Sequence, residues 1–259
     1  MVAINWLGPK GSKGKPTSGT WNTTTNWDAG KVPGRSDDVN LGGNSAYTVT
    51  LDTTGNVKSL TIANNDATLA IGTQTLNIDI ANTTSSSISV TNGHVTIAGG
   101  KIVGSGGLAL ASGTDLSGSG NLSTTLSGAG TVTATGGGTL ELANTVTNIG
   151  MLQVNSGSRL KLDAASSAAT TIVMAPAAGP PAILEVVSAL TVTNPLAVVG
   201  GATLQLDPRS TLTDTMGVAL VGGTITGAGT LAGNTNLYGY GTVDKTLRPL
   251  APSSRSRAA

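Results

Sequence analysis

The stretch GGGTLEL at residues 136–142 decides the fold, because the same pattern returns along most of the chain. A glycine-rich turn leads into a short strand in which apolar residues occupy alternate positions. The other copies are Leu69-x-Ile71, Ile88-x-Val90, Leu108-x-Leu110, Leu160-x-Leu162, Leu184-x-Val186 and Leu204-x-Leu206. Consecutive copies begin about 20 residues apart. The exception is the longer interval between Leu108 and Leu140, in which Leu126 heads an irregular copy. A repeat of this length with a period-2 strand in each copy predicts a stacked β-solenoid.

A second set of apolar pairs trails the first by seven or eight residues, as Leu76 follows Leu69 and Val95 follows Ile88. Alternate residues of each strand point into the column, and the intervening Thr, Ser and Asn residues point outward. This offset suits a rung with two or three faces joined by short turns. We therefore expect an all-β fold, a parallel β-helix of about ten rungs of roughly 20 residues.

The composition suits a narrow column of stacked aliphatic side chains. Of the 259 residues, 37 are glycine and none is phenylalanine, and aromatic residues make up only 2%. A compact globular domain of this length normally fills a wider core with more aromatic side chains. The low aromatic content therefore favours a rod with a thin core.

The sequence divides into four segments. Residues 1–17 are rich in Gly, Lys and Pro and are predicted to form a flexible lead, and residues 18–44 form a Trp-containing cap region. Residues 45–247 form the solenoid, and residues 248–259 form a C-terminal tail or linker. Pro176, Pro180 and Pro181 interrupt the solenoid and predict a loop outside the column. This loop is either a candidate binding loop or a tolerated insertion.

Trp21 and Trp27 lie six residues apart in the cap region. One interpretation is that they lid the open end of the column, because a bare terminal rung exposes backbone groups that template aggregation. The alternative is a carbohydrate platform, in which the face of an indole ring stacks on a sugar. Both interpretations make these two residues the candidate site at the N-terminal end.

Several motifs carry a resemblance to a known family. The phrases Gly19-x-Trp21, Asn26-Trp27 and Gly30-x-Val32-Pro33 resemble the opening of large bacterial surface proteins built on β-helices. The stretches at residues 127–132, 136–142 and 223–231 resemble the passenger-associated strand repeats of autotransporters. This resemblance implies a right-handed parallel β-helix exported to the bacterial cell surface. The translocator barrel of that family is not seen here, so we expect a passenger segment or a relative.

Charge and cysteine content exclude several partners. Charged residues make up 10% of the chain, the formal net charge is +1, and the basic residues are scattered, so we expect no nucleic-acid partner. The chain has no cysteine, which excludes disulfides and thiolate metal sites.

No apolar run approaches the roughly 20 residues of a membrane span, so we expect no membrane insertion. Residues 1–6 do not have the pattern of a signal peptide.

The search for chemistry returns no convincing catalytic set. His94 is the only histidine, and because it precedes the inward-facing Val95 we expect its side chain to face solvent. Carboxylates on adjacent rungs are able to support glycoside cleavage, but the acidic residues fall mostly beside turns, where Asp stabilises the backbone. The calcium-binding nonapeptide repeat is absent, and we expect no cofactor and no metal.

The function expected from the sequence is structural and extracellular. Because no catalytic set is found, we expect a non-enzymatic protein. The low charge and the lack of an obvious C-terminal cap favour association of its copies, through the ends of the solenoid or through terminal segments, into a filament or surface layer. The alternative is an adhesin module that binds a host receptor or a glycan. The second alternative is a polysaccharide lyase or hydrolase.

Overall fold

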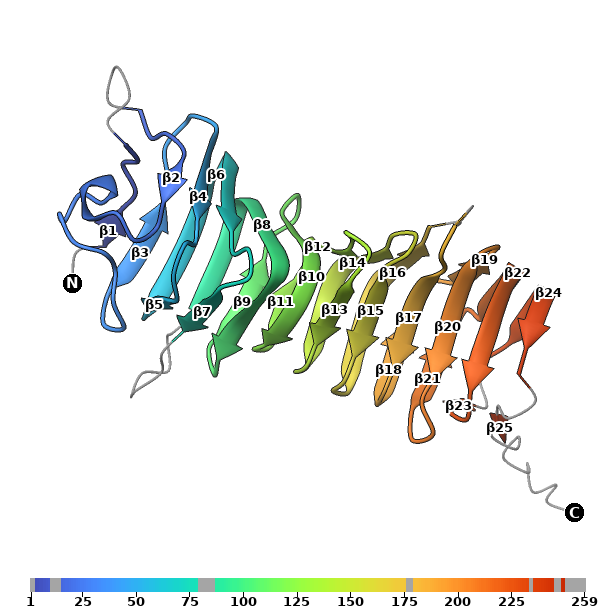
Figure 1. Ribbon diagram of the computed structural model, residues 1–259. Helices are drawn as coiled ribbons and strands as arrows, with labels where there is room; N and C mark the ends of the chain where they lie inside the picture. Colours follow the sequence, from blue (N-terminus) through green and yellow to red (C-terminus); the bar gives the residue numbers. More distant parts are fainter. Residues whose placement is uncertain are drawn as a thin grey trace, which may run out of the picture.

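The protein is a rod of stacked parallel strands (Figure 1). The computed structural model describes residues 3–9, 15–78, 87–175, 179–232, 235–244 and 248–249. The predicted all-β parallel β-helix is confirmed, and it has about nine turns, close to the ten expected. The described residues contain a single 3-10 turn, η1 (Thr24–Asn26), and no helix among them is long and apolar enough to cross a membrane.

Each turn has three strand-bearing faces, which we call face A, face B and face C in chain order. Face A contains β1 (Ile4–Asn5), β3 (Asp38–Leu41), β9 (Gly107–Leu110), β11 (Leu126–Gly128), β18 (Ala189–Val192), β21 (Thr211–Asp214), β23 (Thr230–Leu231) and β25 (Arg248–Pro249). Face B contains β2 (Gly19–Thr20), β4 (Tyr47–Thr50), β12 (Thr131–Ala134) and β19 (Leu196–Val199). Face C contains β5 (Gly55–Val57), β7 (Thr75–Ile78), β13 (Thr139–Leu142), β15 (Arg159–Leu162), β17 (Ala182–Val186) and β20 (Ala202–Leu206).

The longer strands turn a corner and contribute to more than one face. They are β6 (Ser59–Ala70), β8 (Ser87–Gly104), β10 (Asp115–Ser123), β14 (Val146–Val154), β16 (Ser166–Met174), β22 (Val218–Gly227) and β24 (Leu237–Val243). For example, β8 pairs with β9 on face A, and its last residues pair with β7 on face C. The corners of the coil are therefore continuous with the strands in these turns.

The core is a column of aliphatic residues in register from turn to turn. Leu142 on β13 pairs with Leu162 on β15, Leu162 pairs with Val186 on β17, and Val186 pairs with Leu206 on β20. Each of these side chains is almost completely buried, and each alternates with an outward-facing neighbour. Burial of one such side chain contributes roughly 1.5–3 kcal/mol before the entropy cost is subtracted. The stacks therefore dominate the stability of the rod.

The repeat copies lie on different faces of the coil. The copies headed by Leu140, Leu160 and Leu184 share face C, whereas Leu108 lies on face A. Leu126 pairs directly with Leu108, so the copy that looked irregular belongs to a regular turn. The long interval arises because the clearest apolar pair moves from face A to face C.

The segment boundaries differ from those expected. Residues 4–6, assigned from sequence to the flexible lead, are part of the cap, where Ile4 and Trp6 are buried. The first full turn begins at Asp38 rather than at residue 45. At the other end, β25 pairs with β23, although its residues were assigned to the tail.

Candidate functional site

The two predicted tryptophans lie inside the N-terminal cap. Trp21 is 0% exposed and Trp27 is 2% exposed. Trp27 packs edge to face on Trp21 and on Trp6, with ring centroids 4.8 Å apart in both pairs. The Trp27 indole N–H donates to the Trp21 carbonyl at 2.8 Å. Both predicted rings are therefore covered by protein, and neither presents a face on which a sugar can stack.

The cap also occupies the outer backbone edge of the first strands. The Asn5 N–H donates to Asp28 Oδ1 at 2.8 Å, and the Asn5 carbonyl accepts from the Asp28 N–H at 3.1 Å. On β2, the Thr20 carbonyl accepts from the Asn26 side-chain amide at 2.9 Å. These backbone groups are the ones that a further strand would use, so a strand added to this end would have to displace residues 26–28.

The predicted proline loop lies at the corner between faces B and C, far along the rod from the cap (Figure 1). Pro180 and Pro181 are exposed, and Pro176 lies outside the described residues. The Pro180 carbonyl accepts from the Gly157 N–H at 2.8 Å and from the Ser156 hydroxyl at 3.1 Å. The described part of the loop is thus fastened to the preceding turn, and it is not brought near the tryptophans.

His94 lies on the outside of face B, where Asp115 of the next turn is its register partner. Its Nδ1 contacts Asp115 Oδ1, and the side chain is 44% exposed. The register places Thr68 on one side of this pair and Thr131 on the other. The pair joins two adjacent turns, and no cluster of three metal-ligating side chains is found in the described part of the chain.

Face C carries a ladder of charged and amide side chains that sequence reasoning did not single out. Glu141 lies between two turns: Asn121 donates to its Oε2 at 2.5 Å and Lys161 to its Oε1 at 2.8 Å. Lys161 also contacts Asp163 at 2.9 Å. One register step further, Arg159 donates to Glu185 at 2.5 Å. Because the partners are about one turn apart in sequence, only the coil register brings them together.

The electrostatics of this ladder favour a structural role. The hydrogen bond from Lys161, followed by those from Asp163 and Asn121, lowers the pKa of Glu141 to about 2. The same contacts with Glu141 and Asp163 raise the pKa of Lys161. A general acid or base needs a pKa near the working pH, and these two shifts move away from it. Burial, with a contribution from Glu141, raises the pKa of Asp163.

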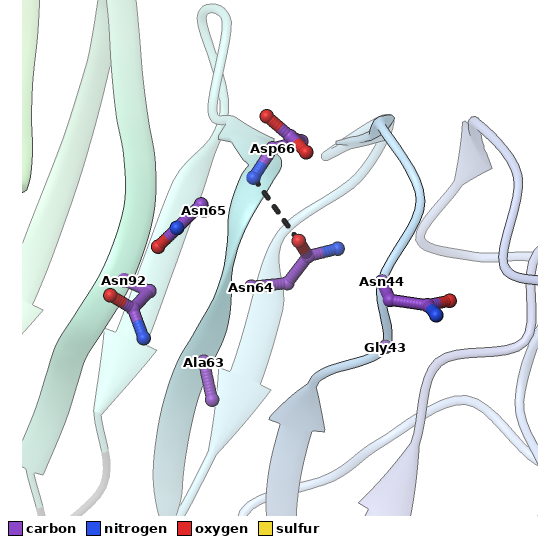
Figure 2. A pocket seen from close by; sticks show the side chains of 7 residues that line it. All are labelled: Gly43, Asn44, Ala63, Asn64, Asn65, Asp66 and Asn92. Atoms are coloured by element: carbon purple, nitrogen blue, oxygen red, sulfur yellow. Dashed lines mark hydrogen bonds between the residues drawn. The ribbon is translucent and has the colours of Figure 1, made fainter.

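An asparagine-rich hollow of about 290 Å³ lies where three successive turns pass from face A to face B (Figure 2). Its lining residues are Gly43, Asn44, Ala63, Asn64, Asn65, Asp66 and Asn92. Asn64 is buried and already paired, because its amide donates to the Ser45 carbonyl and its Oδ1 accepts from the Asp66 N–H. The other polar side chains of the hollow are exposed and offer donors and acceptors to a ligand with hydroxyl groups.

The C-terminal end of the described coil is built differently from the N-terminal end. All seven residues of β24 are exposed. Six of the eight exposed large hydrophobic residues lie in the last two turns: Met216, Val221, Leu237, Tyr238, Tyr240 and Val243. The other aromatic residues, Trp6, Trp21, Trp27 and Tyr47, are buried in the cap or in the strand β4 beside it. Exposed apolar residues that gather in this way are typical of interaction surfaces.

The outer backbone edge of β24 has no partner strand among the described residues. The Asn236 carbonyl accepts from the Val218 N–H at 2.7 Å. Because backbone groups alternate between the two edges of a strand, those of Leu237 and Gly239 point away from β22. Sequence reasoning did not single out β24, although the YGYG stretch at residues 238–241 holds two of the three tyrosines.

None of the family models, curated proteins or solved structures with which the chain was compared matches it. The stacked parallel coils are consistent with a β-helical protein, and no family match supports the resemblance to autotransporters.

Proposed function

We propose that this chain is a non-enzymatic, extracellular structural β-solenoid whose copies associate through the C-terminal end of the rod. The observation that carries the proposal is the asymmetry of the two ends. Residues 26–28 occupy the outer edge of β1 and β2, whereas β24 exposes an edge without a described partner strand, together with apolar side chains. An open strand edge with exposed apolar side chains is a ready template for pairing with another chain.

The charge of the chain is compatible with association. With a formal net charge of +1, two copies repel each other only weakly at neutral pH. Among residues 237–244, Asp244 is the only charged residue. Two copies of β24 are therefore able to approach without charge repulsion from the strand itself, and Lys245 and Arg248 follow it in the sequence.

A matched pair of lysine substitutions tests the proposal. Tyr240 is 71% exposed, so Tyr240→Lys places a charge on β24 without removing a core side chain. Leu7→Lys places the same charge on the N-terminal cap, where Leu7 is 44% exposed. In sedimentation velocity at increasing concentration, the wild type and Leu7→Lys are expected to associate, and Tyr240→Lys is expected to stay monomeric. A wild type that is monodisperse and monomeric at every concentration would refute the proposal.

Glycan binding is the second candidate function, and the asparagine-rich hollow favours it. Asn65 and Asn92 are exposed on neighbouring turns and offer amide groups that suit the hydroxyls of a sugar. A glycan array should show a ligand for the wild type that the double variant Asn65→Ala/Asn92→Ala fails to bind. Equal binding by both proteins would count against this site. The directions of the pKa shifts at Glu141 and Lys161 do not favour polysaccharide cleavage on face C.

A further inference from the structure

We infer that the partner of the C-terminal end is the C-terminal end of a second copy, so that two rods join tail to tail into a closed dimer. This inference rests on the proposed function and specifies its geometry. A head-to-tail filament would require β24 of one copy to pair with the N-terminal strands of the next. The backbone groups needed for that contact, at Asn5 and Thr20, are already bonded to residues 26–28.

The symmetry of the contact follows from this restriction. When the open edge of β24 pairs with the same edge of a second copy, the two strands are related by a two-fold axis and run antiparallel. Such a contact is isologous and closes after two copies. The chain then forms a rod of twice the length rather than a polymer.

The alternation along β24 suggests one register. Leu237 and Gly239 are the register partners, one turn later, of the inward-facing Val218 and Leu220. The residues between and after them, Tyr238 and Tyr240, therefore point outward on face B. With the two-fold axis at Gly239, Tyr238 of one copy lies opposite Tyr240 of the other, and the reverse pair forms as well. Neighbouring aromatic side chains across two strands stabilise antiparallel pairs.

The size of the contact sets the expected affinity. Strands of four or five residues and the corners between them give a triangular coil with sides on the order of 15–25 Å, whose end has an area of roughly 100–300 Å² per partner. That area is below the roughly 800 Å² per partner of a standard stable interface. We therefore expect a dissociation constant in the micromolar range, so the measurements must extend to several hundred micromolar.

Distances between spin labels on single-cysteine variants test the orientation, because the chain has no cysteine of its own. Arg209→Cys and Ser156→Cys place labels at exposed corners near the C-terminal end and near the middle of the rod. In a tail-to-tail dimer, each turn between a label and the C-terminal end adds about 4.8 Å to the distance once in each copy. The distance between the two copies of a label is therefore roughly 20 Å for Arg209→Cys and 40 Å for Ser156→Cys. In head-to-tail stacking both distances equal the repeat, on the order of 50 Å.

The outcomes separate this inference from the proposed function. Two unequal distances in about the expected ratio support tail-to-tail pairing, and association with equal distances would overturn it while leaving self-association intact. A monomer would overturn both. A monomer whose β24 amides are protected from hydrogen exchange would mean that residues 250–259 of the same chain cover the edge.

Mixed cysteine variants test the register. When Tyr238→Cys and Tyr240→Cys proteins are mixed under mild oxidation, the predicted register gives disulfide-linked heterodimers in excess over either homodimer. Both substitutions affect exposed side chains, so the coil should remain folded. An excess of one homodimer would place the two-fold axis at that residue and contradict the register.

Discussion

Replacement of Asp214 by alanine should destabilise the C-terminal turns strongly. Asp214 is fully buried and follows Val192 in an inward-facing stack. Its Oδ2 accepts from the Leu196 N–H at 2.9 Å, and its Oδ1 accepts from the Met216 and Gly217 N–H groups at 3.0 and 2.9 Å. The side chain therefore ties one corner of the coil to the corner of the preceding turn.

The magnitude follows from the donors that Asp214→Ala would leave without an acceptor. The N–H groups of Leu196 and Gly217 are buried, whereas water is able to reach the N–H group of Met216. A buried donor without a partner costs about 1–3 kcal/mol, so with two such donors the variant should lose about 2–6 kcal/mol. Asp52→Ala is the matched control, because Asp52 is exposed and accepts a single bond, from the Asn22 N–H. We expect the control to lose less than about 1 kcal/mol.

Urea unfolding followed by circular dichroism gives the overall change, and hydrogen exchange locates it. In a stacked repeat each turn contacts only its neighbours, so exchange should accelerate mainly in residues 189–227 and much less near the cap. An Asp214→Ala protein that unfolds at the same urea concentration as Asp52→Ala would refute the assignment of Asp214 as the tie between these corners.

Two other predictions concern the glycine corners and the face C ladder. Gly118→Ala should lower the free energy of unfolding, measured by the same urea titration, by several kcal/mol more than Gly113→Ala. Both glycines have a positive φ. However, a Cβ added at Gly118 would lie 1.8 Å from the Ile97 carbonyl oxygen, whereas Gly113 faces open space. Equal losses would contradict this packing. Glu141→Gln should remove a pH-dependent part of the stability, because the folded-state pKa of Glu141 is lowered to about 2. That part is present above the unfolded pKa of about 4.3 and is lost as the pH falls towards 2. Since Lys161 and Glu141 are each about 30% exposed, the loss at pH 7 should not exceed about 1 kcal/mol, and a larger difference between variant and wild type at pH 2 than at pH 7 would contradict the sign.

The fold was predictable because its signal is local. The alternation in Leu140-x-Leu142, preceded by glycines and repeated at about 20 residues, requires a strand and a turn in each copy. The assignment of each copy to one of three faces was not predictable in this way. Leu108 and Leu140 carry the same local pattern, and only the pairing of strands shows that they lie on different faces.

The candidate sites were harder to predict, because they depend on contacts between turns. Trp21 and Trp27 were identified as a pair, but their burial depends on Trp6, which comes from a segment assigned to the lead. Glu141 and Lys161 meet only because the turns are in register. Tyr240 looked ordinary in the sequence, since its exposure depends on the absence of a described strand beyond β24.

Negative-stain electron microscopy of the intact protein, cross-linked at concentrations up to several hundred micromolar before dilution onto the grid, tests the central claim most directly. A single rod of about nine turns and its cap is about 50 Å long at 4.8 Å per turn. Tail-to-tail association predicts that rods of about 100 Å become the dominant species as the concentration rises, and that they do not lengthen further. Rods of about 50 Å at every concentration would contradict the claim that the C-terminal end is a self-association surface.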